Sequence, residues 1–286
     1  MTITMIPETF SADVDFTSTQ LVRPTNRAGV VATAATFAGR TLRQFVRTPQ
    51  LLVVGALTSI MFLLIFRYVF GGAIGTGELD YVDFLIPGLA AAGALFTGTG
   101  GAVGVAEDVD SGLLDRMRSL PIPRSAVLLG RSLADTALVG WGLFITLAVG
   151  VLTGFRIHGS PVEAAAAVGL CLVYGFAFSW PFIYMGLSAG NAQAAQGMSF
   201  LAFPLVFVSS AYVPVDSMPG WMQPIAEHQP VTPMVGSVRA LFLGDEAEAV
   251  LGHSAGWFTV RALLWCVAIV AVFLPLATRR FARSSS

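Results

Sequence analysis

The chain has 286 residues, of which 55% are hydrophobic and 12% charged, and its mean hydropathy is +0.74. Soluble globular proteins carry about 25% charged residues, so this composition excludes an ordinary soluble domain. The net charge of −1 argues against a nucleic-acid partner, because such proteins show a basic excess. All 16 basic residues are arginines. Without lysine the chain lacks the phosphate-binding lysine of an ATPase loop, so any ATP must be hydrolysed by another chain.

The first 27 residues are polar, rich in threonine and serine, and contain no apolar run suited to a signal peptide. We expect a flexible cytoplasmic N-terminus. Residues 28–47 then show helical periodicity, with Arg40, Arg43 and Arg47 on one face. The opposite face is apolar and consists of Ala34, Ala38, Leu42 and Phe45. This pattern predicts an amphipathic helix along the inner membrane surface, the alternative being a straight extension of the next apolar segment.

Six apolar stretches approach or reach the roughly 20 residues that a helix needs to cross a bilayer. They cover residues 51–70, 84–106, 137–155, 164–187, 192–213 and 262–277. Twelve of the 16 arginines fall on one side of these spans, which places both termini in the cytoplasm by the positive-inside rule. The sequence therefore predicts an all-α, multi-pass protein of the cell membrane with six transmembrane helices.

Apart from Arg67 near the outer end of the first span, none of the six predicted spans contains Asp, Glu, Arg, Lys or His. Ion-coupled carriers place such groups inside the membrane, so this chain has no evident coupling group. Arg131 and Asp135, four residues apart at the inner entrance to the third span, are interpreted as an interfacial ion pair rather than a proton relay.

The second span is rich in small residues, which allow helix backbones to approach closely in a membrane. Gly100 and Gly104 form a G-x-x-x-G pair, and a second row of four-residue spacing begins at Gly93. These glycines predict helix packing within the bundle, or else a sliding or dimer interface.

The inner loop between the second and third spans reads as a short amphipathic helix. Asp110 or Ser111 can cap it, and the prolines that follow stop it at about Leu120. Leu113, Leu114 and Met117 supply an apolar side, and the charged groups are Asp115, Arg116 and Arg118. Such a helix is suited to docking into a groove of another protein. An ordinary solvated connector is the alternative.

The outer segment 214–261 is apolar and rich in proline in its first half. Thr232 is predicted to cap a helix that ends at Gly244. Val235, Val238 and Phe242 recur along one face of it. We expect helices that lie on or dip into the outer leaflet, with Trp221 as an interface anchor.

Two motifs that could indicate catalysis or metal binding lack the structural setting that such sites need. Ser188 lies in a G-x-S-x-G pattern, but that nucleophile needs a strand–turn–helix setting and a histidine base. His158, His228 and His253 are all expected on the outer side and lack metal-ligand spacing. We therefore expect no metal site.

Three segments together resemble the type-2 ABC transporter permeases, and most closely the daunorubicin-resistance membrane subunits. The first is F-L-I-P-G-L at 84–89, and the second is the inner segment with Glu107, Gly112, Arg116, Leu120, Pro121 and Arg124. The third is the outer run with Tyr212, Pro214, Pro219, Trp221, Pro230 and Arg239. The likeness covers residues 28–283 and leaves the N-terminus outside it.

The resemblance implies a permease without enzymatic activity, which binds no cofactor of its own. Two permease chains, identical or different, would pair among the membrane lipids, and each would contact a separate ATPase subunit that binds ATP and Mg²⁺. The inner loop would be the coupling helix, with ATPase contacts at Gly112, Leu113, Asp115, Arg116, Arg118 and Leu120. The connecting helix would carry Arg40, Arg43, Phe45 and Arg47, and the outer gate would include Pro214, Trp221, Val235 and Arg239.

An uncharged apolar path offers no ion ligands, so the expected function is outward transport of an amphipathic drug or lipid-like molecule. A polysaccharide or glycolipid exporter of the same superfamily is the first alternative, and an aromatic-lined channel would favour it. An intramembrane serine hydrolase using Ser188 and a non-transporting scaffold are alternatives from other classes.

Overall fold

The computed structural model describes residues 29–76, 79–118, 122–244 and 247–283. This part of the chain folds into helices and turns, without a strand. The helices are α1 (Val30–Arg47), α2 (Pro49–Leu64), the π-helical turn η2 (Ile65–Phe70), α3 (Tyr81–Asp110), α4 (Leu113–Arg118), α5 (Arg124–Leu152), α6 (Pro161–Ser188), α7 (Ala192–Ser199), α8 (Ala202–Phe207), the 3₁₀ turn η3 (Val215–Ser217), α9 (Gln223–His228), α10 (Val231–Leu243), α11 (Ala247–Leu251) and α12 (Ala255–Arg283).

Among the described residues, five helical segments are long and apolar enough to cross a membrane. They are α2 with η2, α3, α5, α6 and α12, and each overlaps one of the predicted spans. The prediction placed the start of α5 thirteen residues too late, because it avoided the polar residues from Arg131 to Asp135. These residues are buried against other helices, where partners inside the protein satisfy them.

A continuous fifth span over residues 192–213 is wrong. The segment forms α7 and α8, and together they cover only Ala192–Phe207. The N–H groups of Phe200 and Leu201 bond to carbonyls three residues earlier, which tightens the chain between the two helices. After Phe207 the backbone continues in turns whose polar groups meet side chains such as Ser209 and Gln229. Broken helices persist at membrane depth only where protein satisfies them in this way.

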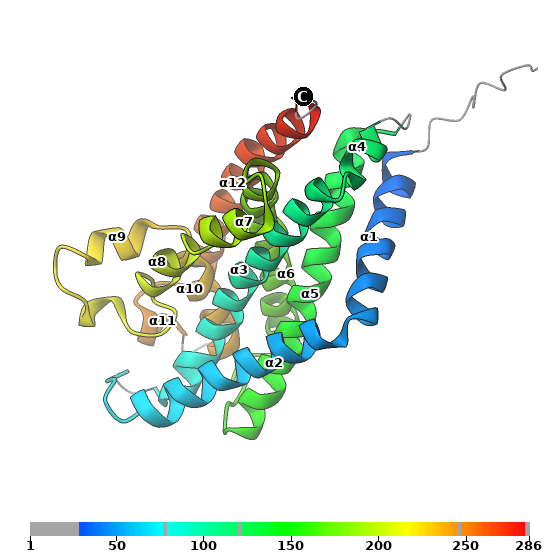
Figure 1. The fold of residues 1–286 in the computed structure, drawn as a ribbon. Coiled ribbons are helices and arrows are strands. Elements are labelled where there is room, and N and C mark those ends of the chain that lie inside the picture. The colour runs from blue at the N-terminus through cyan, green and yellow to red at the C-terminus, as the bar shows by residue number, and fades with distance from the viewer. Residues whose placement is uncertain (1–28, 77–78, 119–121, 245–246, 284–286) are drawn as a thin grey trace, which may run out of the picture.

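The two central helices of the bundle are α3 and α6, whose apolar stretches are each 61% buried. The corresponding stretch of α2 is 6% buried, and Figure 1 shows this helix crossing the side of the bundle. The end of the bundle where α3 meets α4 and where α12 finishes is called the α4 end (Figure 1).

Helix α10, which the sequence predicted to lie on or dip into the outer leaflet, packs inside the protein against α3, α6 and α12. Every residue of it except Leu241 is buried. Thr232 does not cap α10 either, because its hydroxyl accepts from the Ser210 N–H and the Gln229 amide. Gly244, with φ +66°, ends the helix as expected. A helix that is apolar on all sides is stable only when surrounded.

Helix α1 is separate from α2 rather than a straight extension of it. The chain turns at Thr48, and Pro49 begins α2, so the two helices point in different directions (Figure 1). Helix α1 packs along α5, where Gly130 leaves room for the Ala34 carbonyl: a Cβ at Gly130 would lie 2.6 Å from that oxygen. This contact brings Arg40 to the α4 end.

Candidate functional site

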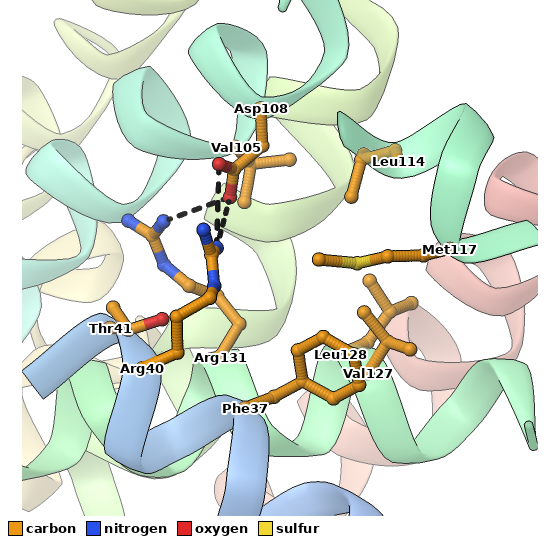
Figure 2. Close-up of a pocket in the computed structure, with 10 residues that line it drawn as sticks. All are labelled: Phe37, Arg40, Thr41, Val105, Asp108, Leu114, Met117, Val127, Leu128 and Arg131. Carbon is orange, nitrogen blue, oxygen red and sulfur yellow. Dashed lines mark hydrogen bonds and ion pairs between the residues drawn. The ribbon is translucent and has the colours of Figure 1, made fainter. Parts of the chain in front are cut away.

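Four charged side chains from three helices meet at the α4 end, and we call them the charged cluster: Arg40 of α1, Asp108 of α3, and Arg131 and Asp135 of α5. Arg40 Nη2 lies 3.2 Å from Asp108 Oδ2, and Arg131 Nη1 lies 3.8 Å from the same oxygen (Figure 2). Arg131 Nε also donates to Asp135 at 3.1 Å, which confirms the predicted pair. Arg131 therefore links α5 to α3, and Asp108 links α3 to α1 through its ion pair with Arg40.

Glycines of α3 make room for the arginine and aspartate of α5. A Cβ at Gly101 would lie 2.7 Å from Asp135 Oδ2, and one at Gly104 would lie 2.6 Å from Arg131 Nη2. Arg131 also donates to the Gly101 carbonyl at 3.2 Å. The Arg131 and Asp135 side chains are only 10% and 3% exposed. Such burial is tolerable because each charge has a partner of opposite sign and further hydrogen bonds.

The charged cluster adjoins the apolar side of α4. Leu114 and Met117 are buried there against Val105, Val127 and Leu128, around a cavity of about 20 Å³ (Figure 2). The sequence suggested that this apolar side docks into another protein. In the structure this apolar side holds α4 against the chain's own bundle. A displacement of α4 would therefore move α3 and α5 directly.

We expect Asp108→Asn to loosen α1 without unfolding the bundle, because Arg131 keeps Asp135 as its partner. Arg40 is 39% exposed, so the lost contact is worth about 1 kcal/mol, equivalent to roughly fivefold faster amide exchange in α1. Hydrogen exchange over residues 30–47 in the reconstituted protein measures this.

Asp110→Asn is the matched control, since Asp110 is an exposed carboxylate two residues along the same helix. Equal exchange of α1 in both variants would contradict a role for Asp108 in anchoring that helix.

The residues predicted to contact an ATPase lie on and around α4. Gly112 adopts φ +67° in the turn between α3 and α4, a conformation that favours glycine. Leu113 is half-buried, and Asp115 and Arg116 are exposed. Arg118 ends α4, and Leu120 lies outside the described residues. On α1, Arg43 and Arg47 are exposed and Phe45 is half-buried.

A second, larger cavity of about 370 Å³ opens between α2, α3, α5 and the α7–α8 segment. Its lining is aromatic and hydroxylic, without a charged side chain: Gly55, Thr58, Ser59, Phe62, Leu89, Gly93, Phe96, Thr97, Thr99, Thr146, Gln196, Phe200, Phe203 and Tyr212. Two of the rings, Phe96 and Phe203, pack at 4.9 Å between centroids. The size lies within the usual range of about 300–1,000 Å³ for small-molecule sites.

The glycines predicted to pack helices do so only in part. Gly104 meets Arg131, whereas a Cβ at Gly93 or Gly100 would meet no atom within 4 Å. Gly93 instead lines the larger cavity. The close contacts of α3 are made by other glycines, such as Gly98, whose Cβ would collide with the Phe182 ring.

The four predicted gate residues do not form one group. Val235 and Arg239 are buried on α10, with 0% and 2% exposure, whereas Trp221 is 71% exposed and Pro214 lies in the turn before η3. Arg239 donates to the Phe84 and Ser210 carbonyls at 2.9 Å each. Arg239 is thus buried within the protein, in a segment that the sequence predicted to lie on or dip into the outer leaflet.

The hydrolase alternative finds no support in the geometry. Ser188 Oγ is buried and has no hydrogen-bond partner among the described residues, so none of them is in position as a base to activate it. His228 Nδ1 lies 2.9 Å from Pro224 O, and the His253 ring stacks on Trp257.

Comparison with known proteins assigns the family. The family model described as ABC-2 type transporter matches residues 34–243. The chain belongs to the ABC-2 type transporter family. The permease is 32% identical over 258 residues to the daunorubicin resistance ABC transporter permease protein DrrB1 of Streptomyces coeruleorubidus, which covers 89% of this chain and 88% of that protein.

Two further relatives agree. The probable doxorubicin resistance ABC transporter permease protein DrrC of Mycobacterium tuberculosis (strain CDC 1551 / Oshkosh) is 28% identical, with 94% of this chain and 96% of that protein covered. The putative transport permease ycf38 of Cyanophora paradoxa is 24% identical over 70% of each chain. The resemblance stated from the residues alone is thereby confirmed.

Sequence reasoning missed two features of the permease. It did not connect Arg40 to Asp108, which lie 68 residues apart. It also did not identify the larger cavity, whose only sequence signal is a recurrence of threonine and phenylalanine within apolar spans.

Proposed function

We propose that this permease is the membrane subunit of an ATP-driven exporter that moves an amphipathic drug or lipid-like molecule outward. The observation that carries the proposal is the larger cavity, which is wide enough for a small molecule and has no charged lining residue. Such a lining suits an apolar body with a few polar groups. The names of two relatives, which refer to resistance to daunorubicin and doxorubicin, point to the same class.

In this proposal, the partner ATPase transmits the energy of ATP hydrolysis to the permease at the α4 end. A separate ATPase subunit binds ATP and Mg²⁺ and contacts α4 through exposed Asp115 and Arg116. The arginine distribution supports a cytoplasmic location for this end and for both termini. Because α4 is held by Leu114 and Met117 against α3 and α5, its displacement shifts helices that line the cavity. A second permease chain, of the same or another kind, completes the path.

We expect Gly112→Val to lower transport strongly, because a β-branched residue at φ +67° costs about 1–2 kcal/mol and displaces α4. Arg116→Ala should lower it by removing a charged contact. Substrate efflux and ATP hydrolysis are measured together in proteoliposomes that hold the permease and its ABC ATPase partner. ATP hydrolysis should continue while efflux falls.

Gly169→Ala is the control, since its Cβ meets no atom within 4 Å on a regular helix. Unchanged efflux in both α4 variants would refute the assigned coupling role. A complete absence of ATP-dependent efflux in the wild type would refute the exporter itself.

One observation supports the polysaccharide or glycolipid alternative. Five of the side chains that line the cavity are aromatic: Phe62, Phe96, Phe200, Phe203 and Tyr212. Aromatic faces bind sugar rings as well as planar drugs. The same proteoliposomes, loaded with a fluorescent lipid-linked oligosaccharide or with a fluorescent amphipathic drug, separate the two functions by which probe is exported.

A further inference from the structure

The serine and threonine hydroxyl groups of the larger cavity already donate their protons within the protein. Each donates to a carbonyl of its own helix, three or four residues earlier, at 2.7–3.1 Å. The five residues are Thr58, Ser59, Thr97, Thr99 and Thr146. This is the usual bond of serine and threonine inside helices. To donate to an occupant, a hydroxyl would first have to give up that bond, so what it offers to the cavity is an oxygen lone pair.

The rest of the lining adds to the same polarity. Gln196 and Tyr212 can both donate and accept, and no lining side chain carries a charge. The rings of Phe96, Phe200 and Phe203 lie against one another at 4.9 and 5.4 Å between centroids. Faces of aromatic rings carry negative partial charge and attract cations. The cavity is therefore lined by aromatic rings and hydrogen-bond acceptors and is poor in hydrogen-bond donors, although it has no formal negative charge.

We propose that this cavity selects cargo with a cationic, hydrogen-bond-donating head, such as a protonated amine on an aromatic or aliphatic body. An ammonium group brings three donors to hydroxyl oxygens and a positive charge to ring faces. A carboxylate or phosphate head would meet acceptors like itself, with only Gln196 and Tyr212 to donate. Thr58, Thr97 and Thr146, from three different helices, determine this preference.

The inference rests on the proposed function, because it takes the cavity as the cargo site. Its test is therefore a binding measurement without ATP and without the ATPase subunit. The probes are pyrenebutylamine, pyrenebutanol and pyrenebutyrate, which share one body and differ in the head. The full-length permease is placed in phosphatidylcholine nanodiscs, and saturable energy transfer from its tryptophans to pyrene is measured, with empty nanodiscs subtracted.

The amine should bind roughly tenfold more tightly than the carboxylate, with the alcohol between them. A variant with Thr97→Val and Thr146→Val keeps the side-chain shape but removes two acceptors, and should reduce the amine preference about fivefold. Thr97→Ser keeps the acceptor and should retain the preference. Thr36→Val on α1 is the matched control, because its exposed hydroxyl makes the same bond, to Ala32 O, outside the cavity.

The inference is overturned if the carboxylate binds as tightly as the amine, if no probe binds saturably, or if the double valine variant keeps the wild-type ranking. The proposed function fails by a different result, namely absent ATP-driven efflux. A loss of efflux with the amine preference intact therefore refutes export and supports the cavity's selectivity.

Discussion

Replacing Arg239 with leucine is expected to cost about 2–5 kcal/mol, because two buried carbonyls lose their donors. The Arg239 side chain donates through Nε and Nη2 to Phe84 O at 3.1 and 2.9 Å and through Nη2 to Ser210 O at 2.9 Å. Its guanidinium carbon lies 3.6 Å from the centroid of the Phe84 ring. Within the described part of the chain no carboxylate pairs with Arg239, so the carbonyl dipoles and the ring balance its charge.

Both carbonyls lie next to irregular backbone. Pro87 lacks an N–H, so the carbonyl of Asp83, one residue before Phe84, has no helical donor and the hydrogen-bond ladder of α3 is interrupted there. Ser210 lies in the turns after α8, where no helix supplies a donor. Arg239 thus joins two interrupted backbones to α10.

Thermal unfolding of the purified protein in detergent, followed by tryptophan fluorescence, measures the effect. Arg239→Leu should lower the midpoint by roughly 5–15 °C. The midpoint of Arg239→Lys should lie between those of the wild type and Arg239→Leu, since lysine lacks the planar guanidinium that reaches both carbonyls. Arg261→Leu is the control, because Arg261 stacks on Trp257 at 4.3 Å near the surface and contributes about 0.5–1 kcal/mol. Equal midpoints for the two leucine variants would contradict this account.

Adding one methyl group at Gly88 is expected to destabilise the protein, whereas the same change at Gly93 is not. A Cβ at Gly88 would lie 1.9 Å from the Ala211 carbonyl oxygen, a backbone atom that cannot rotate away as a side chain could. The segment around Ala211 is also fixed by the bond from Arg239 to Ser210. Overpacking of this kind costs about 1–3 kcal/mol.

Gly93 is a suitable comparison for Gly88 because both lie on helix α3. Its Cβ would meet no atom within 4 Å, so alanine there should gain up to about 1 kcal/mol from helix propensity. The two variants are thus expected to shift the unfolding midpoint in opposite directions. A lower midpoint for Gly93→Ala than for Gly88→Ala would show that α3 and the 208–212 turns are not packed as described.

The parts of the fold that hydropathy identified are those in which each residue's environment follows from its neighbours in sequence. Helices α2, α3, α6 and α12 are long apolar runs, and Ser160 with Glu163 forms a capping box at the start of α6. The break between α7 and α8 escaped detection because it falls at Phe200 and Leu201, which are apolar. Hydropathy reports the environment of a segment, not whether its backbone is continuous.

The misplacement of α10 has a related cause. An apolar helix that ends at a glycine can lie in a leaflet or inside a bundle, and Val235, Val238 and Phe242 suit both. Arg239 was read as an outer charge because arginine is rarely buried. Its burial depends on Phe84, which lies 155 residues away in the chain.

The sequence by itself determined that this is a multi-pass membrane protein of the ABC-2 type, because composition, run length and family motifs are properties of the chain alone. The tertiary structure alone decided which charges meet in the charged cluster, which glycines touch another helix, and which hydroxyls line a cavity. These depend on pairs of residues tens to hundreds of positions apart. Whether a polar group is buried with a partner, and therefore whether it stabilises or destabilises the fold, is settled only when those residues come together.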